Sequence, residues 1–125
     1  MKIGEFLDEL KPKQREAILR CARESGIIDL EEEVELNVED NVINFLKAIS
    51  NPLRLKILKL LKDNWLCVCL ISKILDRDQT LISHHLRTLK SLGLISERRE
   101  GKMRFYRTNT EVLEGYLSRV REELV

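Results

Sequence analysis

The stretch from Leu81 to Asn109, LISHHLRTLKSLGLISERREGKMRFYRTN, constrains what this chain can fold into more than any other. Its first part carries apolar residues at helical spacing, and Gly93 stands where a helix commonly ends in a left-handed residue. Two segments of alternating polarity, 95–99 and 103–107, then flank a glycine, which is the pattern of a β-hairpin. The order predicts a short amphipathic helix followed by a hairpin rich in arginine and lysine.

The rest of the chain predicts helices separated by short turns. Apolar residues recur at three- and four-residue spacing, and residues that suit helix starts precede several of these runs. The predicted helices are 3–11, 13–25, 39–50, 52–62, 65–75, 79–92 and a last one after Thr108. The predicted N-caps are Asn51, Asn64, Asp78 and Thr108, the last in a capping box with Glu111.

Helices 65–75 and 79–92, joined by a short turn, fit a helix-turn-helix. With the hairpin that follows, they predict an α+β fold, mostly α: a winged helix-turn-helix whose wing is the β-hairpin. A chain of 125 residues is long enough for one such domain with an extension. We therefore expect residues 1–40 to form an N-terminal helical extension with an acidic connection, and residues 41–125 to form a DNA-binding and dimerisation domain.

Charge is distributed unevenly along the chain, although the net charge is only +1. Residues 1–41 hold 6 Lys and Arg against 12 Asp and Glu, whereas residues 42–125 hold 16 against 9. The C-terminal two-thirds therefore has the charge sign expected of a domain that binds a polyanion, and the N-terminal third does not.

Composition argues against several other classes of protein. No apolar run approaches the length of a membrane span, and the start MKIGEFLDELKPKQ carries acids and a Pro where a signal peptide needs a long apolar stretch, so we expect a cytoplasmic protein without a membrane partner. Three cysteines, an odd number, argue against a disulfide framework and for metal or redox use. With no Gly-rich phosphate loop and no convincing nucleophile–base pair, we expect no enzyme activity.

The candidate DNA-binding residues lie on the predicted second helix and on the hairpin. On the helix they occupy the outward face near its start, where side chains can reach base edges or phosphates in the major groove. On the hairpin they are cations suited to phosphate or minor-groove contact. The helix residues are Gln79, Thr80, Ser83, His84 and Arg87, and the hairpin residues are Arg98, Arg99, Lys102 and Arg104. The alternative for each residue alone is a solvated polar face.

Adjacent histidines at positions 84 and 85 raise the question of a metal site. Neighbouring residues on a helix point about 100° apart, which disfavours a shared ion. We expect His84 to face outward and His85 to pack or form a hydrogen bond near the core.

The run FLKAISNPLRLKILKLLK, with LCVCLISKIL, QTLISHHLRTLKSLGLI and GKMRFYRTN after it, resembles the ArsR-type winged-helix repressors. The resemblance covers about Asn41 to Val125. It implies a homodimer formed through the first and last helices of the domain, with two recognition helices that read an inverted repeat in double-stranded DNA. It also implies repression without a cofactor for DNA binding, relieved when an inducer binds.

Cys67 and Cys69, within LCVC, resemble the CVC element on which thiolate-sensing members of that family bind arsenite, antimonite, cadmium or lead. Soft thiolates select soft ions. With Asn64 as N-cap, Cys67 would be the third helical residue, where free N–H groups lower the pKa of a thiol. Residues i and i+2 lie about 200° apart on a helix, so one ion could bind both sulfurs only if the helix unwound locally.

The sequence departs from the family pattern around this pair. Leu70 and Ser72 stand where the arsenic-binding version carries Asp and sometimes a third Cys, and Trp65 stands where Glu is common. Cys21 is therefore a candidate third ligand, and its alternative is a small buried apolar residue. We also expect the extension 1–40 to pack over Trp65 and Leu70.

Two further interpretations remain open. Cys67 and Cys69 could sense oxidation through a strained disulfide or a sulfenic acid, or they could be inert buried cysteines. The winged helix could also be an interaction module or a transcription factor that has no inducer.

Overall fold

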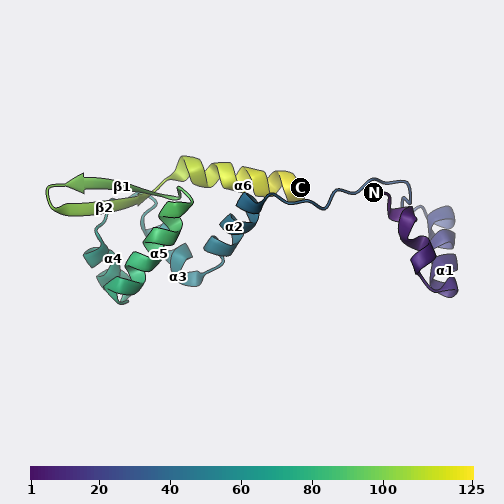
Figure 1. Ribbon diagram of the computed structural model, residues 1–125, viewed down its shortest axis with the longest axis horizontal. Coiled ribbons are helices and arrows are strands. Elements are labelled where there is room, and N and C mark those ends of the chain that lie inside the picture. Colours follow the sequence, from purple (N-terminus) through teal and green to yellow (C-terminus); the bar gives the residue numbers. More distant parts are fainter. The chain divides into compact units, whose positions relative to one another are not determined.

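The computed structural model describes residues 1–125, which form two compact units, Met1–Asn37 and Val38–Val125. The two units are described separately. The C-terminal unit contains α2 (Asp40–Ile49), α3 (Pro52–Leu60), α4 (Val68–Leu75), α5 (Gln79–Ser91), β1 (Ile95–Glu100), β2 (Met103–Thr108) and α6 (Thr110–Leu124), as Figure 1 shows. Its antiparallel hairpin, β1–β2, follows the helix pair α4–α5. The predicted winged helix-turn-helix fold is confirmed.

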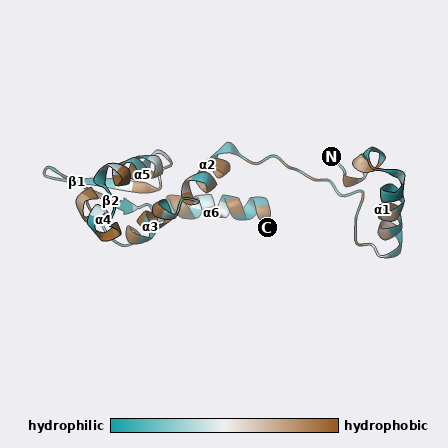
Figure 2. Cartoon of the chain, turned by 90° about the horizontal axis from the view of Figure 1, so that it is seen from below, coloured by the Kyte–Doolittle hydropathy of each residue, from teal (hydrophilic) through white to brown (hydrophobic).

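One hydrophobic core joins the helices of the C-terminal unit. Side chains from α2 to α5 and from the start of the hairpin are buried in it, which fixes α4 and α5 to the same support. Its fully buried members are Val42, Phe45, Ile57, Leu61, Ile71, Ile82, Leu89 and Leu94. The tip of the hairpin, by contrast, is hydrophilic (Figure 2). The fold therefore holds the helix-turn-helix rigidly and leaves a polar ribbon outside the core.

The predicted signals at the ends of α3 and α5 are confirmed. Asn51 Oδ1 accepts hydrogen bonds from the N–H groups of Leu53 and Arg54 at 2.9 and 3.1 Å. Asp78 Oδ2 accepts from the N–H groups that open α5, Thr80 at 3.0 Å and Leu81 at 3.3 Å. Gly93 follows α5 with φ +75°, a left-handed conformation that favours glycine. Short-range chemistry thus fixes where the second helix of the pair begins and ends.

The predicted start of α4 was wrong. Asn64 does not cap it, because its side-chain amide donates to the carbonyl of Leu60 at 3.0 Å. Leu66 instead pairs with Tyr106 of β2 through reciprocal backbone hydrogen bonds of 3.1 and 2.8 Å, which keeps this segment extended. The helix begins at Val68, and Cys67 is its N-cap. A pairing with a distant part of the chain overrides the local helix signal.

The predicted capping box at Thr108 was also wrong. Thr108 is the last residue of β2, and its buried hydroxyl donates to the carbonyl of Leu58 at 2.8 Å. Asn109 caps α6 instead, accepting from the N–H of Val112 at 3.2 Å. The strands are each one residue longer than expected, so the turn consists of Gly101 and Lys102, with Gly101 at φ +59°.

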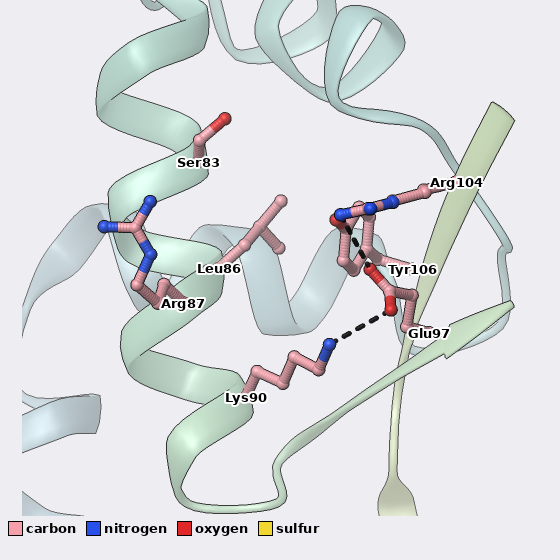
Figure 3. Close-up of a pocket in the computed structure, with 7 residues that line it drawn as sticks. All are labelled: Ser83, Leu86, Arg87, Lys90, Glu97, Arg104 and Tyr106. Atoms are coloured by element: carbon pink, nitrogen blue, oxygen red, sulfur yellow. Dashed lines mark hydrogen bonds and ion pairs between the residues drawn. The ribbon is translucent and has the colours of Figure 1, made fainter. Parts of the chain in front are cut away.

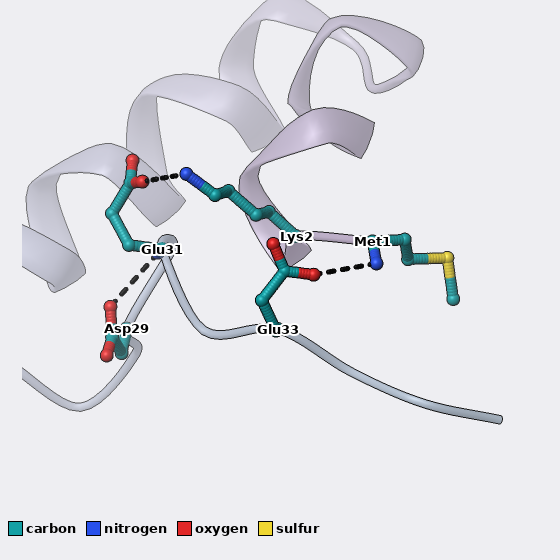
Figure 4. Close-up of polar contacts among 5 residues, drawn as sticks. All are labelled: Met1, Lys2, Asp29, Glu31 and Glu33. Carbon is teal, nitrogen blue, oxygen red and sulfur yellow. Dashed lines mark hydrogen bonds and ion pairs between the residues drawn. The ribbon is translucent and has the colours of Figure 1, made fainter.

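The N-terminal unit contains two helices where two were expected: η1 (Ile3–Glu9), which is a 3₁₀ helix, and α1 (Pro12–Glu24). The N–H of Gly4 donates to the carbonyl of Leu30 at 2.8 Å, and a Cβ at Gly4 would lie 2.9 Å from that oxygen. Two exposed ion pairs join the same segments of chain, the Met1 amine with Glu33 and Lys2 with Glu31, both at 2.8 Å (Figure 4). Hydrogen bonds and close backbone approach therefore shape this unit, in which no residue is fully buried.

Candidate nucleic-acid interface and cysteine pair

Helix α5 separates its apolar face from its polar face sharply. Ile82, His85, Leu86 and Leu89 are buried in the core. The five residues predicted to contact DNA are on the remaining surface: Gln79, Thr80, His84 and Arg87 are exposed and Ser83 is half-buried. The N–H groups of Thr80 and Leu81 at the start of α5 are occupied by the Asp78 carboxylate, so the side chains of this strip, rather than free backbone N–H groups, are what the helix offers to a ligand. The helix therefore offers a continuous polar strip to a ligand.

The hairpin carries its predicted cations on exposed positions. Arg98, Arg99, Lys102 and Arg104 are all exposed, and Arg99 lies opposite Arg104 in the strand register. Only Arg98 is held by a neighbour on its own strand, Glu100, at 2.8 Å. The wing thus presents a set of solvent-facing positive charges of the kind that contacts a phosphate backbone.

A groove lies between α5 and the wing, lined by Ser83, Leu86, Arg87 and Lys90 from the helix and by Glu97, Arg104 and Tyr106 from the strands (Figure 3). Glu97 points into it and accepts a hydrogen bond from Lys90 Nζ at 3.0 Å. Hydrogen bonds from Lys90 and Tyr106 and the charge of Arg104 hold the pKa of Glu97 below its usual range. No pattern in the sequence singles out Lys90, Glu97 or Tyr106, because only the folded hairpin brings them together.

His85 and His84 lie as expected, one in the core and one outside. His85 Nδ1 is 3.2 Å from a guanidinium nitrogen of Arg54, and Arg54 Nε donates to the carbonyl of Ala48 at 2.6 Å. These two interactions link α5 to α3 and to the end of α2. No group of three or more His, Cys, Asp or Glu side chains in the chain is arranged to hold a metal ion.

Acidification is expected to weaken the fold through His85. Burial, and then the charges of Arg54 and His84, lower the pKa of His85 from 6.5. Because the unfolded chain then binds the proton more tightly, the stability present above pH 6.5 is lost as the pH falls through the pKa of the folded state. Urea unfolding at a series of pH values on both sides of that pKa should show this loss. The loss of stability on acidification should be smaller in His85→Gln, and nearly as large as in the wild-type protein in the exposed control His84→Gln. Equal pH dependence of stability in all three proteins would contradict the assignment to His85.

The cysteine pair lies at the start of α4, and its two Sγ atoms are 3.4 Å apart. Cys67 is buried at 6% exposure and Cys69 is exposed. The backbone N–H of Leu70 lowers the pKa of the Cys67 thiol, against the opposing effect of burial. The expectation that the sulfurs point apart was wrong: Cys67, as N-cap, has an extended backbone, so the two sulfurs meet without any unwinding.

Cys21, the candidate third ligand, is exposed on α1 in the N-terminal unit. The alternative that it is a small buried residue therefore does not hold. Within the C-terminal unit, Leu70 is 48% exposed on α4 and Trp65 is half-buried. Leu70 thus leaves part of the apolar surface beside the cysteine pair open to solvent.

A core-anchored helix pair, a polar strip on its second helix and a cationic hairpin beside it define a DNA-binding winged helix-turn-helix protein. Residues 51–97 match the family model described as "Bacterial regulatory protein, arsR family". The chain is 44% identical over 68 residues to an uncharacterized HTH-type transcriptional regulator of Methanocaldococcus jannaschii, covering 54% of this chain and 76% of that protein.

A second relative is the cadmium resistance transcriptional regulatory protein CadC of Listeria innocua, 40% identical over 67 residues, or 53% of this chain and 56% of CadC. Among solved structures, reduced HlyU from Vibrio cholerae is similar with a TM-score of 0.54 and 35% identity, covering 68% of this chain and 90% of HlyU. The homodimeric winged helix-turn-helix domain Mb0332 from Mycobacterium bovis has a TM-score of 0.56 and 30% identity, covering 73% of this chain and 94% of that domain.

The chain belongs to the arsR family of bacterial regulatory proteins. It is a DNA-binding transcriptional regulator and not an enzyme, as the sequence predicted. No helix in it is both long and apolar enough to cross a membrane.

Proposed function

We propose that this chain is a homodimeric repressor that binds an inverted repeat in double-stranded DNA and leaves it when Cys67 and Cys69 react. The observation that carries the proposal is the 3.4 Å separation of the two sulfurs at the start of α4. Dimerisation is supported by Mb0332, a homodimer of the same fold, and the family resemblance implies α2 and α6 as the helices of the interface. Exposed apolar residues on those helices, Ile43, Leu46 and Leu117, offer the surface.

Two structural connections link the cysteine pair to the proposed DNA face. Helix α4 packs directly against the recognition helix α5. Leu66, immediately before Cys67, is hydrogen-bonded through both its N–H and its carbonyl to Tyr106 of the wing. A change in the backbone at Cys67 would therefore displace the helix and the wing together. A ligand whose binding to the cysteines moves this backbone would then oppose DNA binding, with reciprocal coupling.

The first candidate inducer is a soft metal or metalloid ion such as arsenite or cadmium. Sulfurs 3.4 Å apart are close enough for one soft ion to be held by both. Such an ion would bridge the two thiolates, and the lowered pKa of Cys67 favours the thiolate that it needs. The similarity to CadC, a cadmium resistance regulator, supports this candidate. Cys21 of either subunit is a candidate for a third ligand.

Oxidation is the second candidate, favoured by the absence of a third side-chain ligand beside the pair. A peroxide would take two electrons from the two thiols: the Cys67–Cys69 disulfide forms, the peroxide O–O bond breaks, and the two thiol protons leave in water. The sulfurs would have to approach from 3.4 Å to about 2.05 Å, which requires movement at the start of α4.

The test follows reduced protein on fluorescent DNA from upstream of its own gene by anisotropy. Arsenite or cadmium is added to one sample and a mild peroxide to another. Release by the ion alone would support a metal sensor, and release by the oxidant alone would support a redox switch. If neither releases the DNA, control by the cysteine pair is refuted.

The wing and the recognition helix are expected to contribute differently to DNA binding. Arg99→Ala and Lys102→Ala should weaken binding to all duplexes and reduce the salt slope by about 0.9 for each phosphate that is no longer neutralised. Ser83→Ala and His84→Ala should instead reduce the preference for the operator, by about 1–3 kcal/mol for each base that the variant no longer reads. Salt titrations with operator and arbitrary duplexes measure both effects. Uniform reductions in all four variants would refute this division.

A further inference from the structure

We propose that Glu97 limits the affinity of this protein for arbitrary DNA by holding Lys90 to the wing. The inference rests on the proposed DNA-binding face formed by α5 and the hairpin. Glu97 is the only carboxylate among the residues that line the groove between them, where Arg87, Lys90 and Arg104 supply positive charge (Figure 3). A DNA phosphate entering the groove would meet this negative charge.

The interactions of Glu97 involve both of its carboxylate oxygens. Oε2 is 3.0 Å from Lys90 Nζ, and Oε1 is 3.9 Å from a guanidinium nitrogen of Arg104. Tyr106, its partner in the strand register, lines the same groove. The side chain of Glu97 is 26% exposed, far less than that of Glu100, at 57%. The carboxylate is therefore fixed in the groove from both the helix and the wing.

This arrangement pairs one cation of the recognition helix with a carboxylate, although the Lys90 side chain itself is 51% exposed. Arg87, one turn earlier on α5, has no carboxylate within ion-pair distance, whereas the charge of Lys90 is already met by Glu97. Each cation free to meet a phosphate strengthens binding to any sequence and steepens its salt dependence. Since base-reading side chains are unaffected, lowering this contribution raises the preference for the operator over other DNA.

The salt dependence of binding to an arbitrary duplex of about 30 base pairs tests the proposal without knowledge of the operator. Glu97→Gln should bind that duplex roughly tenfold more tightly at low salt, with a slope steeper by about 0.9 for Lys90. Glu100→Gln is the matched control, because it removes the same charge from the same strand but breaks only the exposed pair with Arg98. Its gain should stay below about twofold, as such pairs contribute little.

A double-mutant cycle identifies Lys90 as the residue that Glu97 restrains. Lys90→Gln alone should lower affinity less than about twofold, yet it should cancel most of the gain in the Glu97→Gln background. Equal gains in Glu97→Gln and Glu100→Gln, weaker binding in Glu97→Gln, or much weaker binding in Lys90→Gln alone would each overturn the proposal. If Glu97→Gln folds poorly, the affinity of Lys90→Gln alone still tests the proposal, because a loss much greater than about twofold would show that Lys90 is not restrained by Glu97.

Arg87→Gln and Arg99→Ala separate failure of this inference from failure of the proposed DNA face. Both should weaken binding to the same duplex if α5 and the wing contact DNA. Unchanged binding in these two variants would refute the face itself. Weakened binding in them, with no gain in Glu97→Gln, would refute only the role of Glu97.

Discussion

Cys67→Ser is expected to bind DNA as tightly as the reduced wild-type protein and to stay bound when an ion or oxidant is added. Serine is a preferred N-cap, so the substitution preserves the start of α4 while removing the thiol. When the ion or oxidant is added to the wild-type protein, by contrast, its affinity for DNA should fall by roughly 5- to 150-fold, the range typical of coupled sites. Anisotropy titrations with and without the inducer measure the difference.

Two further variants complete this test. Cys69→Ser should behave as Cys67→Ser does, since either inducer requires both sulfurs. Cys21→Ser should keep full release if the pair acts alone, and should abolish release if Cys21 is the third ligand. Normal release in Cys67→Ser would contradict the proposed role of the pair.

Ile82→Ala is expected to lower the free energy of unfolding by about 2–5 kcal/mol. Ile82 is fully buried on the inner face of α5, and its truncation leaves a cavity between the recognition helix and the core. Leu81, the preceding residue, is 39% exposed, so Leu81→Ala should change this free energy by no more than about 0.5 kcal/mol. Urea unfolding at one fixed protein concentration compares the three proteins, because the proposed dimerisation would make stability concentration-dependent. Equal destabilisation of both variants would contradict the orientation of α5.

The features that the sequence predicted well depend on short-range chemistry. Asn51 and Asp78 cap the helices that they precede, and Gly93 ends α5, because each acts on backbone groups within a few residues. The apolar spacing of α5 likewise placed His85 inside and His84 outside. The fold class followed from the order of such elements, which leaves few ways to cover one core.

The features that the sequence did not predict depend on interactions between distant residues. Leu66 is extended because Tyr106 pairs with it, and this pairing moves the start of α4 from Trp65 to Val68. The same shift brings the sulfurs of the cysteine pair together. Thr108 is likewise drawn into β2 and bonded to Leu58 rather than capping α6. No periodicity within one segment carries information about these partners.

Glu97 illustrates the same limit for the candidate interface. In the sequence it is one acid among the charges of a polar hairpin. Its position in the groove depends on the register of β1 against β2 and on the packing of α5 beside them. The cations that flank it were recognisable by residue type, whereas the carboxylate that restrains one of them was not.

The most direct test of whether the cysteine pair controls the DNA face is to measure the effect of DNA on ligand binding at the cysteines. Cadmium affinity would be measured by competition with a chromophoric chelator in the wild-type protein, free and saturated with DNA from upstream of its gene. If cadmium weakens DNA binding by a given factor, DNA must weaken cadmium binding by the same factor. We predict a reduction in the range of about 5- to 150-fold. Equal cadmium affinity with and without DNA would contradict cadmium-driven release. If peroxide also oxidised the cysteine pair at the same rate in the free and the DNA-bound protein, the coupling between the pair and the DNA face would be contradicted altogether.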